Sequence, residues 1–180
     1  VLSGLGSADG FAGSLNGMAI DNIDALTGST AAADSLTGAN LASQWGLDAT
    51  PDYTSSGRTL DFTSFELLTG GSAADTFTLS GAQTFDLDGG QGTDSFVLSD
   101  TASLTGQIDG SGGTDMLDYS AFTTSVIVDL SSSTAQNISG AVSDVENVTG
   151  GKANDTLTGD AVANLLRGGP GNDILSGLGG

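Results

Sequence analysis

The sequence predicts an all-β protein, a parallel β-helix or β-roll solenoid with turns of about 20 residues. A motif of Gly, four residues, Asp, one residue and then Phe or Leu recurs along the 180-residue chain. The acidity is almost entirely Asp, with Glu66 and Glu146 the only glutamates. Asp and Gly are typical of tight turns, whereas Glu favours helices. No window combines helical periodicity with capping residues.

The spacing of the motif supports stacked turns. Its aspartates are separated by 25, 41, 19, 21, 40 and 18 residues, so four intervals are near one turn and two are near twice that length. A glycine turn followed by a short apolar strand suits a coil whose strands stack about 4.8 Å apart. The copies are Gly4/Asp9/Phe11, Gly28/Asp34/Leu36 with one extra residue, Gly70/Asp75/Phe77, Gly89/Asp94/Phe96, Gly110/Asp115/Leu117, Gly150/Asp155/Leu157, Gly168/Asp173/Leu175 and an Asn version at Gly159/Asn164/Leu166.

Two stretches lack the motif and divide the chain into regions. Residues 40–60 contain Trp45, Pro51 and Tyr53, and we expect a loop insertion there. Residues 121–144 contain the segment 126–130, which is a good β-strand candidate. We therefore expect degenerate β-helical repeats over residues 1–149, with an insertion near 40–60, and a regular repeat over 150–180.

The last region is built of nonapeptides. Gly150, Gly159, Gly168 and Gly177 are nine residues apart, so that two nonapeptides make one turn of 18 residues. Leu157, Leu166 and Leu175 would then point inward from alternating sides, and their burial would drive stacking. Because the final repeat is cut short, we expect the sequence to be a piece of a longer protein with an open end suited to end-to-end self-assembly.

Composition excludes several classes of partner. The chain has 22 acidic and 3 basic residues, a net charge of −19, and no Cys or His. Such a charge disfavours nucleic acid and anionic lipid, which both select Lys and Arg. No stretch is apolar enough to insert in a membrane. Self-repulsion among the carboxylates would be relieved by bound cations.

The stacked aspartates are candidate calcium ligands. Asp155 and Asp173 lie one turn apart, so their loops would lie one above the other and offer carboxylate and carbonyl oxygens. An all-oxygen set suits Ca²⁺ better than Mg²⁺, and the lack of His and Cys disfavours zinc and copper. A second candidate set is Asp75, Asp94 and Asp115, with Asp88 and Asp109 as additional ligands. The alternative is that these carboxylates cap backbone amides without a metal.

The segment GGPGNDILS, residues 168–176, resembles the glycine- and aspartate-rich nonapeptide of RTX proteins. The resemblance implies a β-roll that binds Ca²⁺ between turns and folds outside the cell. It assigns ligation to Asp155, Asp173 and the carbonyl groups of Gly150, Gly168 and Gly171. Ala153 in place of a motif glycine, and Asn164 in place of an aspartate, depart from the pattern.

Upstream segments such as FELLTGGSAADTFTL and VENVTGGKANDTLTG resemble the repeat arrays of giant bacterial surface proteins and adhesins. The implied function is a calcium-stabilised structural module of an adhesin, fibre or surface layer, extracellular or at the cell surface. The alternative is a calcium-binding C-terminal or secretion module of an RTX toxin, protease or lipase.

We expect no enzymatic activity in this piece. Arg58, Lys152 and Arg167 are the only basic residues, and no His is present for a catalytic triad. A glycan or another cell-surface ligand remains a candidate partner. We expect Trp45 and Tyr53 to pack within a loop, with an exposed sugar-binding platform as the alternative, and a flat row of exposed Thr would favour a glycan- or ice-binding face.

Overall fold

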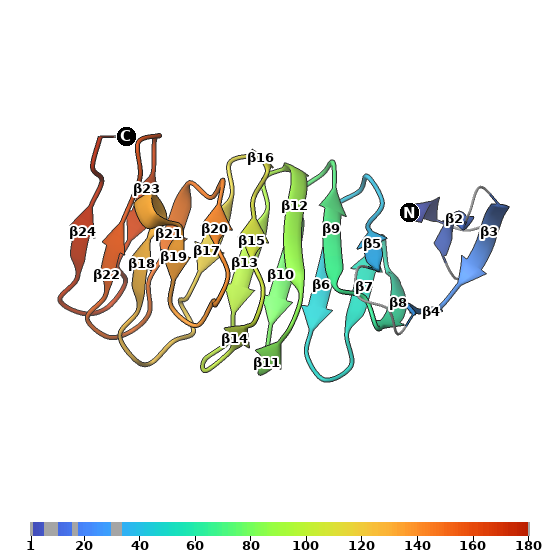
Figure 1. Cartoon of the computed structure of the whole chain (residues 1–180), viewed down its shortest axis with the longest axis horizontal. Coiled ribbons are helices and arrows are strands. Elements are labelled where there is room, and N and C mark those ends of the chain that lie inside the picture. Colours follow the sequence, from blue (N-terminus) through green and yellow to red (C-terminus); the bar gives the residue numbers. More distant parts are fainter. Residues whose placement is uncertain (1, 6–10, 16–17, 30–33, 180) are drawn as a thin grey trace.

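The computed structural model describes residues 2–5, 11–15, 18–29 and 34–179. Its regular structure is almost entirely β-strand, and the one helical element among these residues is the 3₁₀ turn η1 (Leu130–Ser132). The strands lie side by side along the long axis of the molecule (Figure 1). The all-β prediction is therefore confirmed.

The largest sheet has nine strands in the order β23-β21-β17-β13-β10-β6-β7-β8-β4. Every neighbouring pair from β6 to β23 is parallel, as is β8 with β4, whereas β6, β7 and β8 form antiparallel pairs. The bounds are β4 (Ala25–Thr27), β6 (Ser43–Leu47), β7 (Asp52–Ser55), β8 (Arg58–Thr63), β10 (Asp75–Leu79), β13 (Ser95–Leu98), β17 (Met116–Asp118), β21 (Asn147–Thr149) and β23 (Leu165–Arg167).

A second sheet has the order β20-β15-β12-β9-β5, with β16 also paired to β12, and all its pairs are parallel. Its strands are β5 (Ser35–Thr37), β9 (Leu67–Gly71), β12 (Asp86–Gly92), β15 (Ile108–Asp109), β16 (Gly112–Gly113) and β20 (Val142–Ser143).

The remaining strands form three small sheets. In the order β19-β18-β22-β24, the pairs β18–β22 and β22–β24 are parallel and β18–β19 is antiparallel; β11 and β14 form a parallel pair, and β1, β2 and β3 form an antiparallel sheet. The bounds are β1 (Leu2–Leu5), β2 (Phe11–Leu15), β3 (Met18–Ile23), β11 (Ala82–Gln83), β14 (Ser103–Leu104), β18 (Ile127–Asp129), β19 (Thr134–Ala135), β22 (Thr156–Thr158) and β24 (Ile174–Ser176).

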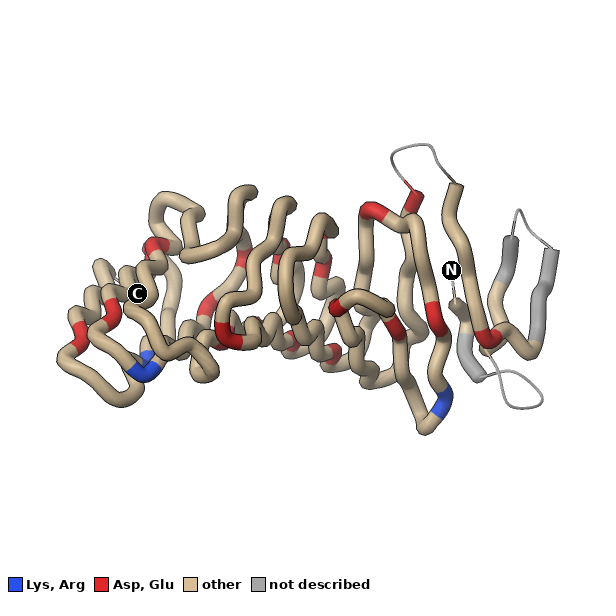
Figure 2. The backbone as a smooth tube through the Cα atoms, turned by 90° about the horizontal axis from the view of Figure 1, so that it is seen from below, with Lys and Arg blue, Asp and Glu red and all other residues tan. Residues whose placement is uncertain are grey.

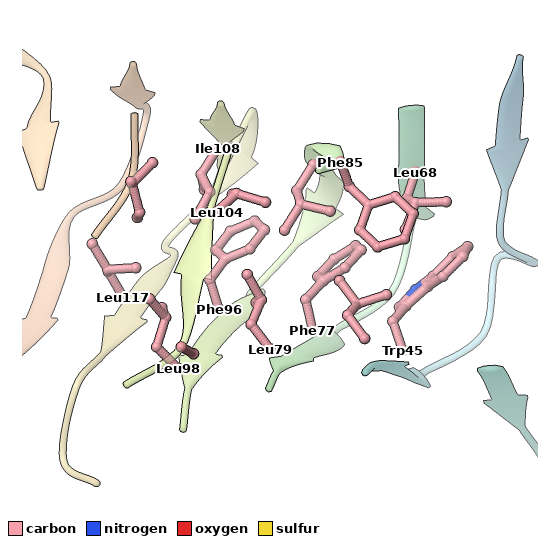
Figure 3. Packing of buried hydrophobic residues seen from close by; sticks show 14 of the residues in the cluster. Trp45, Leu68, Phe77, Leu79, Phe85, Phe96, Leu98, Leu104, Ile108 and Leu117 are labelled. Atoms are coloured by element: carbon pink, nitrogen blue, oxygen red, sulfur yellow. The ribbon is translucent and has the colours of Figure 1, made fainter. Parts of the chain in front are cut away.

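Register places like residues in rows that fill the core (Figure 3). One row along the nine-stranded sheet has Trp45, Phe77, Phe96 and Leu117 directly opposite one another, all buried. Phe77 stacks between Trp45 and Phe96, with ring centroids 5.5 and 5.1 Å apart. Because a one-residue slip would turn a whole strand inside out, these apolar rows fix the parallel register.

The two stretches without the motif lie within residues 34–66 and 115–146, two long excursions after which the chain rejoins the row of strands that it left. In the first, β6 keeps its place beside β10, and β7 and β8 fold back as antiparallel strands. In the second, the expected strand at 126–130 is present as β18. The first copy of the motif differs from expectation: Phe11 lies in the antiparallel sheet of β1–β3, and Asp9 lies outside the described residues. Among the helices of the described residues, none is long and apolar enough to span a membrane.

Candidate functional site: a column of buried carboxylates

The motif aspartates of the nine-stranded sheet bond one another through the backbone. The N–H of Asp75 donates to Oδ1 of Asp94 at 2.7 Å, and the N–H of Asp94 donates to Oδ1 of Asp115 at 2.7 Å. These bonds join residues 19 and 21 positions apart, and all three side chains are at most 1% exposed. We call Asp75, Asp94 and Asp115 the Asp column. The backbone N–H of each member is capped by a carboxylate from the next strand of the sheet.

Other side chains extend the same bonding. The Ser43 hydroxyl donates to Oδ1 of Asp75 at 2.5 Å. At the other end, the N–H of Asp115 donates to Oε2 of Glu146 at 2.8 Å, across 31 residues. The N–H of Asp34 likewise donates to Oε2 of Glu66 at 2.9 Å, across 32 residues. The only two glutamates thus replace Asp where the chain returns from the two long excursions.

Sequence reasoning missed this role of Glu66 and Glu146. The signal was present, because both sit two residues before a buried apolar residue, Leu68 or Val148, in the segments FELLTGG and VENVTGG. Register confirms the equivalence, since Leu68 pairs with Leu36 and Val148 with Leu117.

The motif glycine leaves room for the second carboxylate oxygen and for a backbone carbonyl group of the neighbouring strand, such as that of Gly89 beside Gly70. A Cβ on Gly70 would stand 2.6 Å from Oδ2 of Asp75, and one on Gly89 would stand 2.6 Å from Oδ2 of Asp94. Contacts that close force a shift of the carboxylate or the backbone. A glycine five residues before each Asp therefore leaves the space into which its side chain folds.

Asp155 and Asp173 stack as predicted, but in a different sheet from the Asp column. The N–H of Asp155 donates to Oδ1 of Asp173 at 2.9 Å, across 18 residues, and the N–H of Val126 donates to Oδ1 of Asp155 at 2.8 Å. These residues precede β24, β22 and β18, whereas Asp115 precedes β17 in the nine-stranded sheet. The 40-residue interval from Asp115 to Asp155 therefore does not join two positions of one row.

The second oxygen of each column carboxylate has no hydrogen-bond partner within the part of the chain that the structure describes. In the last turns, Oδ2 of Asp155 accepts the N–H of Gly151 at 2.6 Å. The corresponding amides upstream are used elsewhere, because Gly90 donates to Asp88 and Ser111 donates to Asp109, each at 2.9 Å. Asp88 and Asp109 thus cap their own turns and leave the column oxygens unpaired.

Burial changes the acidity of the Asp column. Desolvation raises the pKa of Asp75 to about 6, of Asp94 to about 7 and of Asp115 to about 6, against the lowering effect of the accepted hydrogen bonds. Nearby carboxylates add to the rise for Asp94 and Asp115; they come from the column itself and from Asp88, Asp109, Asp144 and Glu146. Burial therefore favours the protonated form of these carboxylates, or an ionised form that is paired with a cation.

The oxygen atoms present suit a hard cation. Oδ2 of Asp94 and the carbonyl oxygen of Gly110 both lie beside the Cα of Gly89, where an added Cβ would meet them. Around Gly150, Oδ2 of Asp155 and the carbonyl oxygen of Gly168 converge in the same way. Carboxylate and carbonyl oxygens are the ligands that Ca²⁺ prefers. Among the described residues, no three acidic side chains gather closely enough to hold a metal ion by themselves.

The remaining predicted ligands lie in the C-terminal loops. Gly171 has a φ of +144°, a conformation that favours glycine, and a Cβ there would stand 3.0 Å from Oδ1 of Asp173. Gly168 is buried against the Asp173 carboxylate in the same loop. These glycines hold the loop backbone close to Asp173. Figure 2 shows acidic residues along the length of the chain and few basic ones.

The aromatic residues do not form a surface platform. Trp45 and Tyr53 are fully buried and pack with centroids 4.5 Å apart. The Tyr53 hydroxyl accepts the N–H of Ala39 at 2.9 Å. The outward row of the nine-stranded sheet is mixed rather than a line of Thr: Gln44, Thr76, Ser95, Met116, Asn147 and Leu165.

In comparison with known proteins, no family model matches the chain and no curated protein does.

Proposed function

We propose that this chain is a structural module, a parallel β-helix or β-roll solenoid with turns of about 20 residues, within a larger secreted or cell-surface bacterial protein such as an adhesin, fibre or surface layer. The observation that carries the proposal is the Asp column, in which the carboxylates of Asp94 and Asp115 accept the backbone N–H groups of Asp75 and Asp94. Buried carboxylates used in this way serve architecture, and we assign them no catalytic step.

The pairing supports a stacked coil. Cross-turn bonds join residues 18, 19 and 21 positions apart, close to the repeat expected from the motif. Interactions between nearest neighbours make stability a sum over turns, which suits a rigid spacer of variable length.

Calcium is proposed as the counter-charge. The proposed ligands are Asp155, Asp173 and the carbonyl groups of Gly150, Gly168 and Gly171, and upstream Asp75, Asp94 and Asp115 with Asp88 and Asp109. Support comes from the unpaired buried oxygens of the Asp column and from a net charge of −19. A bound cation would neutralise the carboxylates and tie successive turns together. The resemblance to RTX repeats supports folding outside the cell, where calcium is abundant.

The test is a far-UV circular dichroism titration of chelator-treated protein with calcium, with magnesium in a parallel series. We expect a rise of the β signal that calcium produces and magnesium does not. Full β structure in excess chelator, unchanged by calcium, would contradict the calcium part and leave the solenoid. A spectrum without β structure in calcium would contradict both.

A further inference from the structure

A polar pocket with a volume of about 340 Å³ lies beside the inserted hairpin of β7 and β8. It is placed where β6 begins, where β7 ends and where the chain enters β10, so the hairpin supplies one of its sides. Its volume is within the range of roughly 300–1,000 Å³ that is typical of small-molecule sites. Because the hairpin is an insertion in the repeat, this pocket has no counterpart that the repeat itself requires.

The lining of the pocket is polar but uncharged. Five lining residues carry a hydroxyl group and one carries an amide: Ser43, Thr54, Ser55, Ser56, Thr76 and Gln44. The other lining residues are Ala or Gly, although the chain as a whole has a net charge of −19. Calcium selects carboxylate and carbonyl oxygens, and an anion selects Arg, Lys or a helix N-terminus. The lining therefore favours a neutral ligand that carries several hydroxyl groups.

Two buried hydroxyl groups hold the floor of the pocket in place. The side chains of Ser43 and Ser55 are only 5% and 1% exposed. The Ser43 hydroxyl donates to Oδ1 of Asp75 at 2.5 Å, and the Ser55 hydroxyl donates to the carbonyl oxygen of Ala42 at 3.1 Å. Since each hydroxyl proton is already engaged, each oxygen can only accept a hydrogen bond from a ligand. A sugar hydroxyl group is such a donor.

The rim of the pocket has polar groups to spare. Within the described part of the chain, the side chains of Gln44, Ser56 and Thr76 have no hydrogen-bond partner. An amide and two hydroxyl groups can both donate and accept, which matches the mixed character of sugar hydroxyl groups. Ala42 and Ala74 add small apolar surfaces that suit the C–H groups of a sugar ring.

We infer that this pocket binds one neutral sugar unit of a glycan. Its hydroxyl groups donate to the oxygens of Ser43 and Ser55 and exchange hydrogen bonds with Gln44, Ser56 and Thr76. This binding goes beyond the proposed structural function, and it requires neither bound calcium nor a particular parent protein. A single sugar held by neutral hydrogen bonds should bind in the millimolar range, which several copies of the module would strengthen.

The test is an amide NMR titration of the full chain with the methyl glycosides of glucose, galactose, mannose and N-acetylglucosamine. Calcium chloride and N-acetylneuraminic acid are titrated separately as charged ligands. We expect at least one neutral glycoside to give saturable shift changes confined to the residues around the pocket, and neither charged ligand to do so.

Two pairs of variants locate the site. Ala74→Leu fills the pocket and should abolish the shift changes, whereas Ala49→Leu, at an exposed position in the loop between β6 and β7, should preserve them. Thr76→Val removes one lining hydroxyl group at nearly constant volume and should weaken binding about two- to tenfold. Thr78→Val is its control, because Thr78 is exposed in the same strand but does not line the pocket.

Three results would overturn the inference. The first is a folded chain that shows no saturable change with any of the four glycosides. The second is binding that Thr76→Val and Thr78→Val weaken equally, or that Ala74→Leu leaves intact, because the sugar would then lie elsewhere. The third is a saturable change around the pocket with calcium or N-acetylneuraminic acid alone, which would assign the pocket to a charged ligand. None of these results bears on the stacked-strand architecture, so the proposed function is tested separately.

Discussion

Asp94 donates its backbone N–H to the side chain of Asp115, 21 residues later, while its own side chain accepts the N–H of Asp75. Asp94 is therefore a donor to one neighbouring strand and an acceptor from the other. Removing one such side chain removes a hydrogen bond between two neighbouring strands, so the importance of the motif can be measured residue by residue.

Asp94→Ala should destabilise the fold, because the Asp75 amide loses its acceptor in a buried site. We expect a loss of about 1–3 kcal/mol in the free energy of unfolding. Asp94→Asn should be far milder, since its side-chain carbonyl can accept the same bond without a buried charge. Denaturant unfolding followed by the fluorescence of buried Trp45 measures both. Asp24→Ala, at an exposed aspartate, is the control, and equal losses at both sites would contradict the role of the Asp column.

Without calcium, stability should fall as pH rises from about 4 to 7. The pKa values of Asp75, Asp94 and Asp115 are raised to about 6, 7 and 6 from an ordinary value of 3.8, so the folded chain binds more protons than the unfolded chain in this window. Thermal unfolding in chelator at stepped pH measures the slope. Asp94→Asn should flatten it, and an unchanged or rising stability would contradict the buried-acid assignment.

Calcium should matter most where the column is ionised. If calcium replaces the proton as the counter-charge, the calcium-dependent rise in melting temperature will be larger at pH 8 than at pH 5. The same thermal series with calcium in place of chelator measures this difference. Equal rises at both pH values would place bound calcium away from the column.

Gly89→Ala should be strongly destabilising. Its Cβ would stand 2.6 Å from Oδ2 of Asp94 and 2.9 Å from the carbonyl oxygen of Gly110, so the backbone must shift. We expect a loss of about 2 kcal/mol or more, typical of overpacking in a buried site. Gly177→Ala, where no atom lies within 4 Å of the added Cβ, is the control in the same denaturation assay. A neutral Gly89→Ala would mean that the motif glycine serves another purpose.

Glu146→Asp should be more damaging than Glu146→Gln. The shorter side chain withdraws the acceptor from the Asp115 amide, whereas Gln keeps a carbonyl oxygen at the same reach. We expect a loss of about 1 kcal/mol for Glu146→Asp and little change for Glu146→Gln. Hydrogen exchange at Asp115, measured beside the unfolding free energy, separates this bond from a general loosening. Faster exchange in the Gln variant alone would contradict the assignment.

Residue types and spacing predicted the strands, the apolar rows and the stacking of Asp155 on Asp173, because a period near 20 with alternating burial leaves few other arrangements. Whether the carboxylates face the interior or the solvent could not be predicted in the same way. The sequence pattern around Asp75 is the same for both orientations, and only the backbone geometry at Gly70 distinguishes them. The hydrogen bond from Asp34 to Glu66 was not predicted either, because the inserted hairpin between them makes their separation longer than the repeat period.

The hydrogen bonds of the Asp column all run in the same direction along the chain. In each of them, and in the similar bonds that Asp34, Val126 and Asp155 donate, the donor amide comes earlier in the chain than the acceptor carboxylate. When a chain is made or exported with its N-terminus leading, each donor amide must wait for the strand that carries its acceptor before this bond can close. The most recently emerged strand therefore lacks this bond until the next strand of its sheet follows it.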